Sequence, residues 1–286
     1  EIDMTLVQAM KLLVLLSVML TVVSLALRAR AGDFLYLFRE WRLGLRAVIA
    51  MFVIVPAVAI LMANVFELKG PVKIALVALA FSPVPPLLPR KQVKAGGEAS
   101  YITGLLVAAA LASLVLAPIG LSVTGAIYGV ETQVSRAGMA TTLGLTIALP
   151  LLLGVLGQRV LGDERAAAVS GPLSKVANVL FGVSVLALLV ALAPAVGKLL
   201  GDGTIVALVA MSLVGLAAGW FLAGDDRDNR IVLALASAAR HPGVAIGIAT
   251  TSFPDAKLAP AAIILAAVVN TLIAIPFLKR LQKSEA

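Results

Sequence analysis

An apolar run near the end of the chain, residues 231 to 252, has a positive charge and helix breakers at its centre. The central residues are Arg240, His241, Pro242 and Gly243, and His241 is the only histidine of the chain. A guanidinium stays protonated in proteins and offers five N–H donors, so Arg240 is suited to bind an anion. An imidazole titrates near neutral pH, so His241 is either a proton-coupling group or a neutral hydrogen-bonding group that lines a cavity.

A second apolar segment, residues 71 to 95, is interrupted by prolines and then becomes basic. Proline removes an amide donor and clashes with the preceding turn, so these prolines either break the helix or, alternatively, only kink it or lie at the membrane interface. Interruptions in corresponding positions of two halves are the sequence feature that best indicates the substrate site of a secondary transporter. The predicted binding residues at the two breaks are Arg240, His241, Gly243, Pro83, Pro85 and Pro86, with Arg90, Lys91 and Lys94 as auxiliary charges.

The elements that position these residues lie in a membrane. Of the 286 residues, 61% are hydrophobic and 13% are charged, and the mean hydropathy is +1.06. Such a chain has too little polar surface for a soluble domain, and its apolar runs show no strand-like alternation. The sequence predicts an all-α, polytopic protein with about nine transmembrane helices, at residues 4–27, 44–65, 71–95, 99–127, 136–160, 173–199, 203–223, 230–252 and 257–278.

The positive charges are distributed unequally between the two sides of the predicted membrane. Sixteen Lys and Arg residues lie in one set of loops, around residues 28–46, 90–94, 159–175 and 227–230 and after residue 278, against five in the opposite set. Positively charged residues concentrate in cytoplasmic loops, so we expect the N-terminus to lie outside and the C-terminus to lie in the cytoplasm. We expect the protein to lie in the inner membrane of the cell. The net charge of +8 therefore indicates topology and no nucleic-acid partner.

The sequence lacks the motifs of several classes of enzyme. Motifs of metalloproteases, P-loop nucleotide-binding proteins and serine hydrolases are missing, so the chain is not expected to be an enzyme. One histidine and no cysteine leave no metal site, and no cofactor is expected. Glycine pairs with small-xxx-small spacing, Gly215 with Gly219 and Gly125 with Gly129, predict close helix packing.

The chain resembles the bile acid:sodium symporter family over nearly its whole length. The resemblance is carried by residues 25–34 and 46–56, by Ser82-Pro83 and residues 95–99, and most specifically by residues 226–230, 242–245, 253–254 and 260–263. It implies two inverted repeats with two broken crossover helices, core helices at about 71–160 and 203–278, and panel helices at about 4–65 and 173–199. Members often carry ten spans, so we expect this chain to lack the first and to retain the segment after Glu1 as a span.

The chain departs from the family at the positions to which the resemblance assigns sodium ligands. These positions hold Met51, Leu88, Pro89, Ala236 and Arg240, whose side chains cannot coordinate sodium. Two positions implied in substrate contact hold His241 and Asn270. Sodium is therefore not expected, and Arg240 supplies a fixed positive charge in its place.

These features together predict a secondary transporter of an organic, carboxylate-type anion that works by alternating access without sodium. One alternative is a sodium-coupled symporter whose ion sites have moved. A second is an anion channel or sensor that keeps the fold but does not cycle. The expected partners are the small anion and the lipid bilayer, and the oligomeric state, monomer or dimer, is open.

Overall fold

The computed structural model describes residues 4–29, 31–85, 88–128, 137, 141 and 144–283, and every regular element in these residues is a helix. The N-terminal half contains α1 (Met4–Ala26), α2 (Ala31–Phe34), α3 (Tyr36–Arg39), α4 (Trp41–Val48), the π-helix η1 (Ile49–Ile54), α5 (Val55–Val65), α6 (Gly70–Ala80), α7 (Leu88–Lys94) and α8 (Ala99–Tyr128). The C-terminal half contains the π-helix η2 (Gly144–Ala148), α10 (Leu149–Leu161), α11 (Asp163–Gly197), α12 (Thr204–Leu222), α13 (Arg227–Ala238), α14 (Pro242–Ser252) and α15 (Ala259–Lys283).

Seven of the described helical segments are long and apolar enough to cross a membrane. They are Trp41–Val65, Ser100–Ala126, Gly144–Leu161, Asp163–Gly197, Thr204–Leu222, Arg227–Thr250 and Ala259–Arg280. Two shorter apolar helices, Leu12–Ala26 and Gly70–Ala80, lie in the first and third predicted spans. The protein is thus a multi-pass helical membrane protein, while the count of nine spans and the inverted repeats stay predictions.

One predicted boundary differs clearly from the structure. Residues 163 to 172 were expected in a loop, but α11 begins at Asp163 and continues through Pro172. Gly162 has a φ of +77°, which ends α10, and Asp163 and Glu164 follow in the first turn of α11, where acidic side chains favour the helix dipole. A proline kinks a helix without ending it when neighbouring helices hold both arms, so Pro172 is not a boundary.

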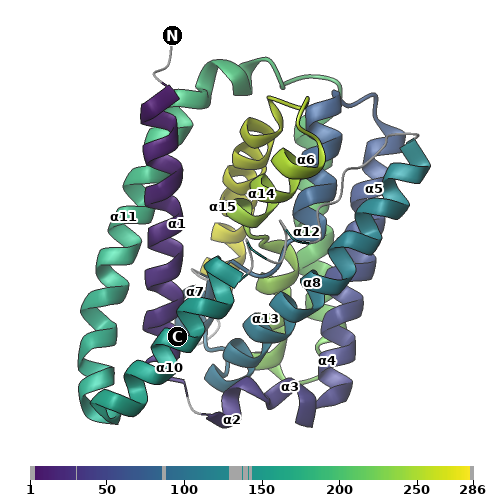
Figure 1. Ribbon diagram of the computed structural model, residues 1–286. Helices are drawn as coiled ribbons and strands as arrows, with labels where there is room; N and C mark the ends of the chain where they lie inside the picture. Colours follow the sequence, from purple (N-terminus) through teal and green to yellow (C-terminus); the bar gives the residue numbers. More distant parts are fainter. Residues whose placement is uncertain are drawn as a thin grey trace.

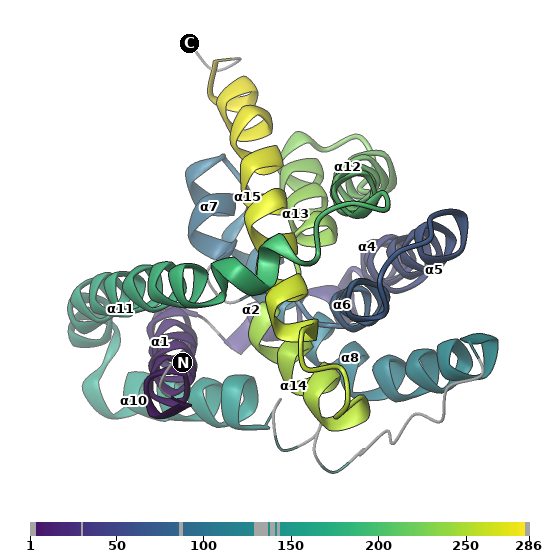
Figure 2. The same cartoon turned by 90° about the horizontal axis from the view of Figure 1, so that it is seen from above.

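The helices form two groups that lie side by side (Figures 1 and 2). In one group, α1 packs against α10 and α11, and the other group contains α4 to α6 and α12 to α15. Helix α11 also contacts α15, which joins the groups. Residues 144–161, assigned to the predicted core, therefore lie against α1 of the predicted panel, and the division into core and panel stays a prediction.

A reciprocal pair of serines fastens α1 to α11. The hydroxyl of Ser24 donates to the carbonyl oxygen of Ser170 at 2.8 Å, and the hydroxyl of Ser170 donates to the carbonyl oxygen of Ser24 at 2.9 Å. Both side chains are buried. Small polar residues of this kind let two membrane helices approach closely while their hydroxyls stay hydrogen-bonded.

The predicted role of Gly215 and Gly219 in packing is confirmed. A Cβ atom at Gly215 would lie 2.8 Å from the Ser237 carbonyl oxygen, and one at Gly219 would lie 2.3 Å from that of Leu233. Helix α12 therefore touches the backbone of α13, the helix that leads into the second break. Gly129, the partner of Gly125 in the other pair, lies outside the described residues.

We expect Gly219→Ala to destabilise the protein, because its Cβ would meet backbone atoms of α13 that cannot move away. Overpacking of this kind costs about 1–3 kcal/mol. The matched control is Gly182→Ala in α11, where an added Cβ meets nothing within 4 Å. Thermal unfolding in detergent should show a lower midpoint for Gly219→Ala and an unchanged midpoint for Gly182→Ala. Equal midpoints for the two variants would contradict the close contact of α12 with α13.

Candidate substrate site at the crossing of two broken helices

The two predicted helix breaks meet in space. Helix α6 ends at Ala80, and α7 begins only at Leu88; α13 ends at Ala238, and α14 begins at Pro242. The N–H of His241 donates to the carbonyl oxygen of Pro83 at 2.9 Å, although the two residues lie more than 150 positions apart in the chain. Extended backbone at membrane depth needs such partners, because no bulk water is present to satisfy its polar groups.

Arg240 is buried at this crossing and is held by backbone carbonyls. Its Nη1 donates to the Ser82 carbonyl oxygen at 3.2 Å, and its Nη2 donates to that of Met51. The guanidinium carbon lies 5.4 Å from the centre of the Phe52 ring, a cation–π contact. The side chain is 6% exposed, and none of the ion pairs among the described residues includes it. The positive charge of Arg240 is therefore hydrogen-bonded but not neutralised.

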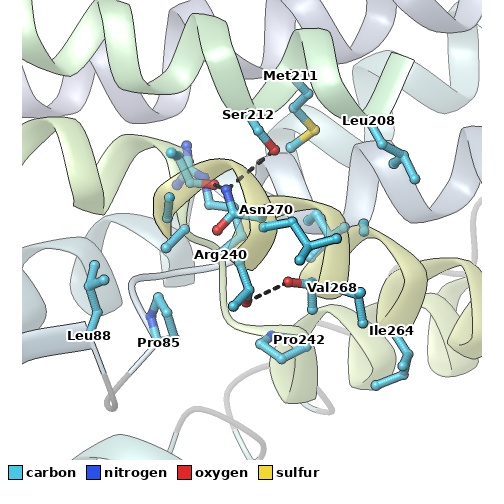
Figure 3. Close-up of a pocket in the computed structure, with 18 of the residues that line it drawn as sticks. Pro85, Leu88, Leu208, Met211, Ser212, Arg240, Pro242, Ile264, Val268 and Asn270 are labelled. Carbon is cyan, nitrogen blue, oxygen red and sulfur yellow. Dashed lines mark hydrogen bonds between the residues drawn. The ribbon is translucent and has the colours of Figure 1, made fainter. Parts of the chain in front are cut away.

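Arg240 lines a cavity of about 330 Å³ (Figure 3). Helices α6, α7, α11, α12, α13 and α15 and the two breaks contribute to its wall. Its charged lining residues are Arg240 and Lys91, and no carboxylate lines it among the described residues. The rest of the wall is mostly apolar, with Ser212, Asn270 and Thr271 as polar exceptions. An apolar cavity with a few placed polar groups is typical of a small-molecule site.

Asn270 of α15, to which the resemblance assigns a substrate contact, lines the cavity, but its amide hydrogens are used within the protein. Its Nδ2 donates to the Ala238 carbonyl oxygen at 2.9 Å and to the Ser212 hydroxyl at 3.3 Å, the second of which Figure 3 draws. Asn270 therefore ties α15 to α12 and satisfies the last carbonyl of α13. Its amide oxygen is the atom that is left to meet a ligand.

His241 lines a different cavity from Arg240. A second cavity of about 210 Å³ is bordered by His241, Gly243 and apolar residues of α1, α11, α14 and α15. Neighbouring residues in extended backbone point to opposite sides, which explains why two adjacent side chains reach two cavities. Phe181, Pro242 and Ile264 border both cavities. Arg240 and His241 do not converge on one volume.

The imidazole of His241 caps the N-terminus of α14. Its Nδ1 accepts from the Val244 N–H at 3.3 Å, and Gly243 leaves room for the ring, since a Cβ there would lie 3.1 Å from Cε1. An imidazolium has no acceptor nitrogen, so this hydrogen bond requires the neutral ring with its proton on Nε2. The geometry favours the neutral, structural role of His241 over the proton-coupling role.

The remaining predicted residues divide between the cavity and the surface. Pro85 and Lys91 line the larger cavity, and the Pro83 carbonyl is used by His241. Lys94 is exposed and is not among the lining residues. Pro86 and the side chain of Arg90 lie outside the described residues.

Sequence reasoning missed Gln92 of α7. Its side chain is 1% exposed, and its Nε2 donates to the Val232 carbonyl oxygen of α13 at 2.7 Å. This bond fixes the second arm of one broken helix against the first arm of the other. In the sequence, Gln92 lies between Lys91 and Lys94 and therefore looks like a solvent-exposed residue. Only its distance along the chain from the prolines could have indicated that it links the two broken helices.

A family model matches residues 12–198 of the chain, and its description is Sodium Bile acid symporter family. The chain belongs to this family. The match includes Met51 and the first break but ends before Arg240, His241 and Asn270. No curated protein matches the chain. The family is one of membrane transporters, which fits a helical protein whose two broken helices border a cavity.

We expect His241→Asn to keep the stability of the protein and His241→Phe to lose part of it. The Asn side-chain oxygen can accept from the Val244 N–H as the imidazole Nδ1 does, whereas Phe has no acceptor, and a lost N-cap costs about 1 kcal/mol. Thermal unfolding midpoints of the two purified variants measure the difference. If Phe were as well tolerated as Asn, the cap would not be the role of His241.

Proposed function

We propose that the protein is a secondary transporter of a small organic anion of the carboxylate type, that it works by alternating access, and that it does not use sodium. The observation that carries the proposal is the buried, uncompensated charge of Arg240 at the wall of a 330 Å³ cavity. A buried charge is stable only when something pairs with it. The carbonyls of Met51 and Ser82 supply hydrogen bonds but no negative charge, and a bound anion would supply both.

The charge of the cavity wall selects the sign of the substrate. Arg240 and Lys91 both carry positive charge, and no acidic residue lines the cavity among the described residues. An electrostatic interaction is strengthened where water is excluded, so one fixed cation in an apolar wall favours anions strongly over neutral molecules. The apolar lining from α11, α12 and α15 suits the organic part of such an anion.

The contact of Arg240 with Met51 supports a sodium-independent mechanism. Met51 stands where the resemblance assigns a sodium ligand, and here its backbone carbonyl accepts a hydrogen bond from the guanidinium. Ala236, another such position, is fully buried within α13 and has no side-chain oxygen. A tethered guanidinium would thus hold permanently the positive charge that a symporter gains when it binds sodium.

Alternating access would use the two groups of helices as moving parts. Both cavities lie between α11 and the crossing, so a rotation of one group against the other would open them to either side. The hydrogen bonds between Pro83 and His241 and between Gln92 and Val232 would keep the two broken helices together during this motion. We place the protein in the inner membrane with its C-terminus in the cytoplasm, on the charge asymmetry of the loops.

The proposal predicts that charge recognition depends on Arg240. A panel of organic carboxylates, beginning with cholate, is tested for binding by thermal shift, each acid beside its neutral primary amide. We expect at least one carboxylate to stabilise the protein while its amide does not. Arg240→Gln should lower the affinity for that carboxylate by roughly thirtyfold, because a charge-assisted hydrogen bond contributes about 2 kcal/mol to binding. Arg240→Lys should restore only part of the affinity, because an ammonium lacks the planar fork.

Two controls accompany this measurement. The unfolding midpoint of each variant without ligand shows that it is folded, and Lys94→Gln removes a positive charge that is exposed and does not line the cavity. Carboxylate affinity that is the same in the wild type and in a folded Arg240→Gln variant would contradict the proposal. A panel in which no acid is preferred over its amide would contradict it as well.

A further inference from the structure

The carbonyl of Met51 lies inside a continuous helical segment and yet accepts a hydrogen bond from Arg240. Helices α4, η1 and α5 follow one another without a break from Trp41 to Val65. Carbonyls in the middle of a helix normally accept from the N–H four residues later and have no need of another donor. The availability of the Met51 carbonyl therefore needs a local cause.

The cause is the π-helix together with the proline that follows it. In an α-helix the Met51 carbonyl would accept from the N–H of Val55, but here that N–H donates to Ala50, five residues back. The next residue that could donate to Met51 in the π-helical pattern is Pro56, which has no N–H. The two residues four and five positions after Met51 therefore give its carbonyl no hydrogen bond, and this oxygen accepts from Arg240.

The second carbonyl that holds Arg240 is freed in the same way. The helix ends before Ser82, and the residues three and four positions after it are Pro85 and Pro86, neither of which has an N–H. Two carbonyls from separate parts of the chain are thus left without amide partners at one place. Arg240 donates one hydrogen bond to each of them.

We propose that Pro56 is a positioning residue for the anion site: it keeps the Met51 carbonyl free, and this carbonyl holds the guanidinium of Arg240 at the cavity wall. The inference rests on the proposed function for the meaning of the site, but the geometry does not depend on the identity of the substrate. π-Helical turns occur frequently at functional sites, where they rearrange backbone groups in this manner. With an alanine at position 56, the new N–H could bond to Met51 or Phe52 and the segment could relax to an α-helix.

The proposal predicts a cation site that can be emptied and refilled. Arg240→Ala removes the guanidinium but leaves the Met51 and Ser82 carbonyls with no donor, and ethylguanidinium has the planar fork that fits them. We expect ethylguanidinium to raise the unfolding midpoint of Arg240→Ala saturably and not that of the wild type. In Pro56→Ala/Arg240→Ala, ethylguanidinium should bind about tenfold more weakly or worse, because one of its two acceptors is lost.

The controls separate the acceptor role of Pro56 from a general effect on the helix. Pro150 follows the π-helix η2 as Pro56 follows η1, with one residue between, so Pro150→Ala/Arg240→Ala is the matched double variant. It should bind ethylguanidinium as Arg240→Ala does. Ethylammonium carries the same charge without the fork and should stabilise Arg240→Ala much less.

Three results would overturn the proposal. The first is that ethylguanidinium does not saturably stabilise folded Arg240→Ala. The second is that ethylguanidinium binds Arg240→Ala and Pro56→Ala/Arg240→Ala with equal affinity. The third is that Pro150→Ala/Arg240→Ala loses as much affinity for ethylguanidinium as Pro56→Ala/Arg240→Ala does. None of these depends on anion binding. If the rescue succeeded and Arg240→Gln left carboxylate affinity unchanged, the positioning role of Pro56 would stand and the proposed function would fail.

Discussion

The structure depends on how a buried guanidinium is held by backbone carbonyls, with no carboxylate paired to it among the described residues. An arginine near the centre of a bilayer costs about 3 kcal/mol even on the milder insertion scales. Two backbone carbonyls accept from the Nη atoms of Arg240 and an aromatic ring lies near its charge, while its Nε has no hydrogen-bond partner among the described residues. Both carbonyls lie where prolines, and for Met51 also a π-helix, leave the usual amide partners missing or redirected. A carboxylate would have stabilised the arginine more strongly, but it would also have cancelled the charge. In the function that we propose, the carbonyls leave this charge in place for an anionic ligand in the cavity.

The crossing of the broken helices follows from the same constraint. Backbone that leaves the helical conformation inside a membrane must find partners within the protein, and each break supplies them to the other. Pro83 accepts from His241, Ser82 accepts from Arg240, and the imidazole of His241 satisfies the first turn of α14. Asn270 satisfies the end of α13 and Gln92 ties α7 to α13. The polar residues around the crossing thus mostly form hydrogen bonds with the backbone, which leaves few side chains to recognise a substrate. For this reason the proposed function depends mainly on Arg240.

Much of the architecture could be predicted from the sequence because its signals are local. Prolines 83, 85 and 86 and the Arg-His-Pro-Gly run at 240 to 243 disfavour a continuous helix, so both breaks could be predicted, and the apolar runs predicted the helices between them. The predicted span began at residue 173, ten residues after the start of α11 at Asp163, because a helix that continues through Pro172 depends on tertiary support that the sequence does not show. The partner of Arg240 could not be predicted, since Met51 contributes only its backbone carbonyl, and any residue type has one. The alternation of extended backbone, which sends Arg240 and His241 to different cavities, becomes visible only when the exact ends of α13 and α14 are known.

The central claim is that the guanidinium of Arg240 permanently occupies the place of a coupling cation. The most direct measurement is the unfolding midpoint of the wild-type protein as sodium chloride replaces N-methylglucamine chloride at constant ionic strength. Bound ligands raise the midpoint in proportion to the logarithm of their concentration above the dissociation constant, so a sodium site would be visible without knowledge of the substrate. If the guanidinium replaces the coupling ion, the unfolding midpoint should be the same at every sodium concentration. A saturable rise that is specific for sodium would show that the protein binds a coupling ion in addition to Arg240 and would contradict the account.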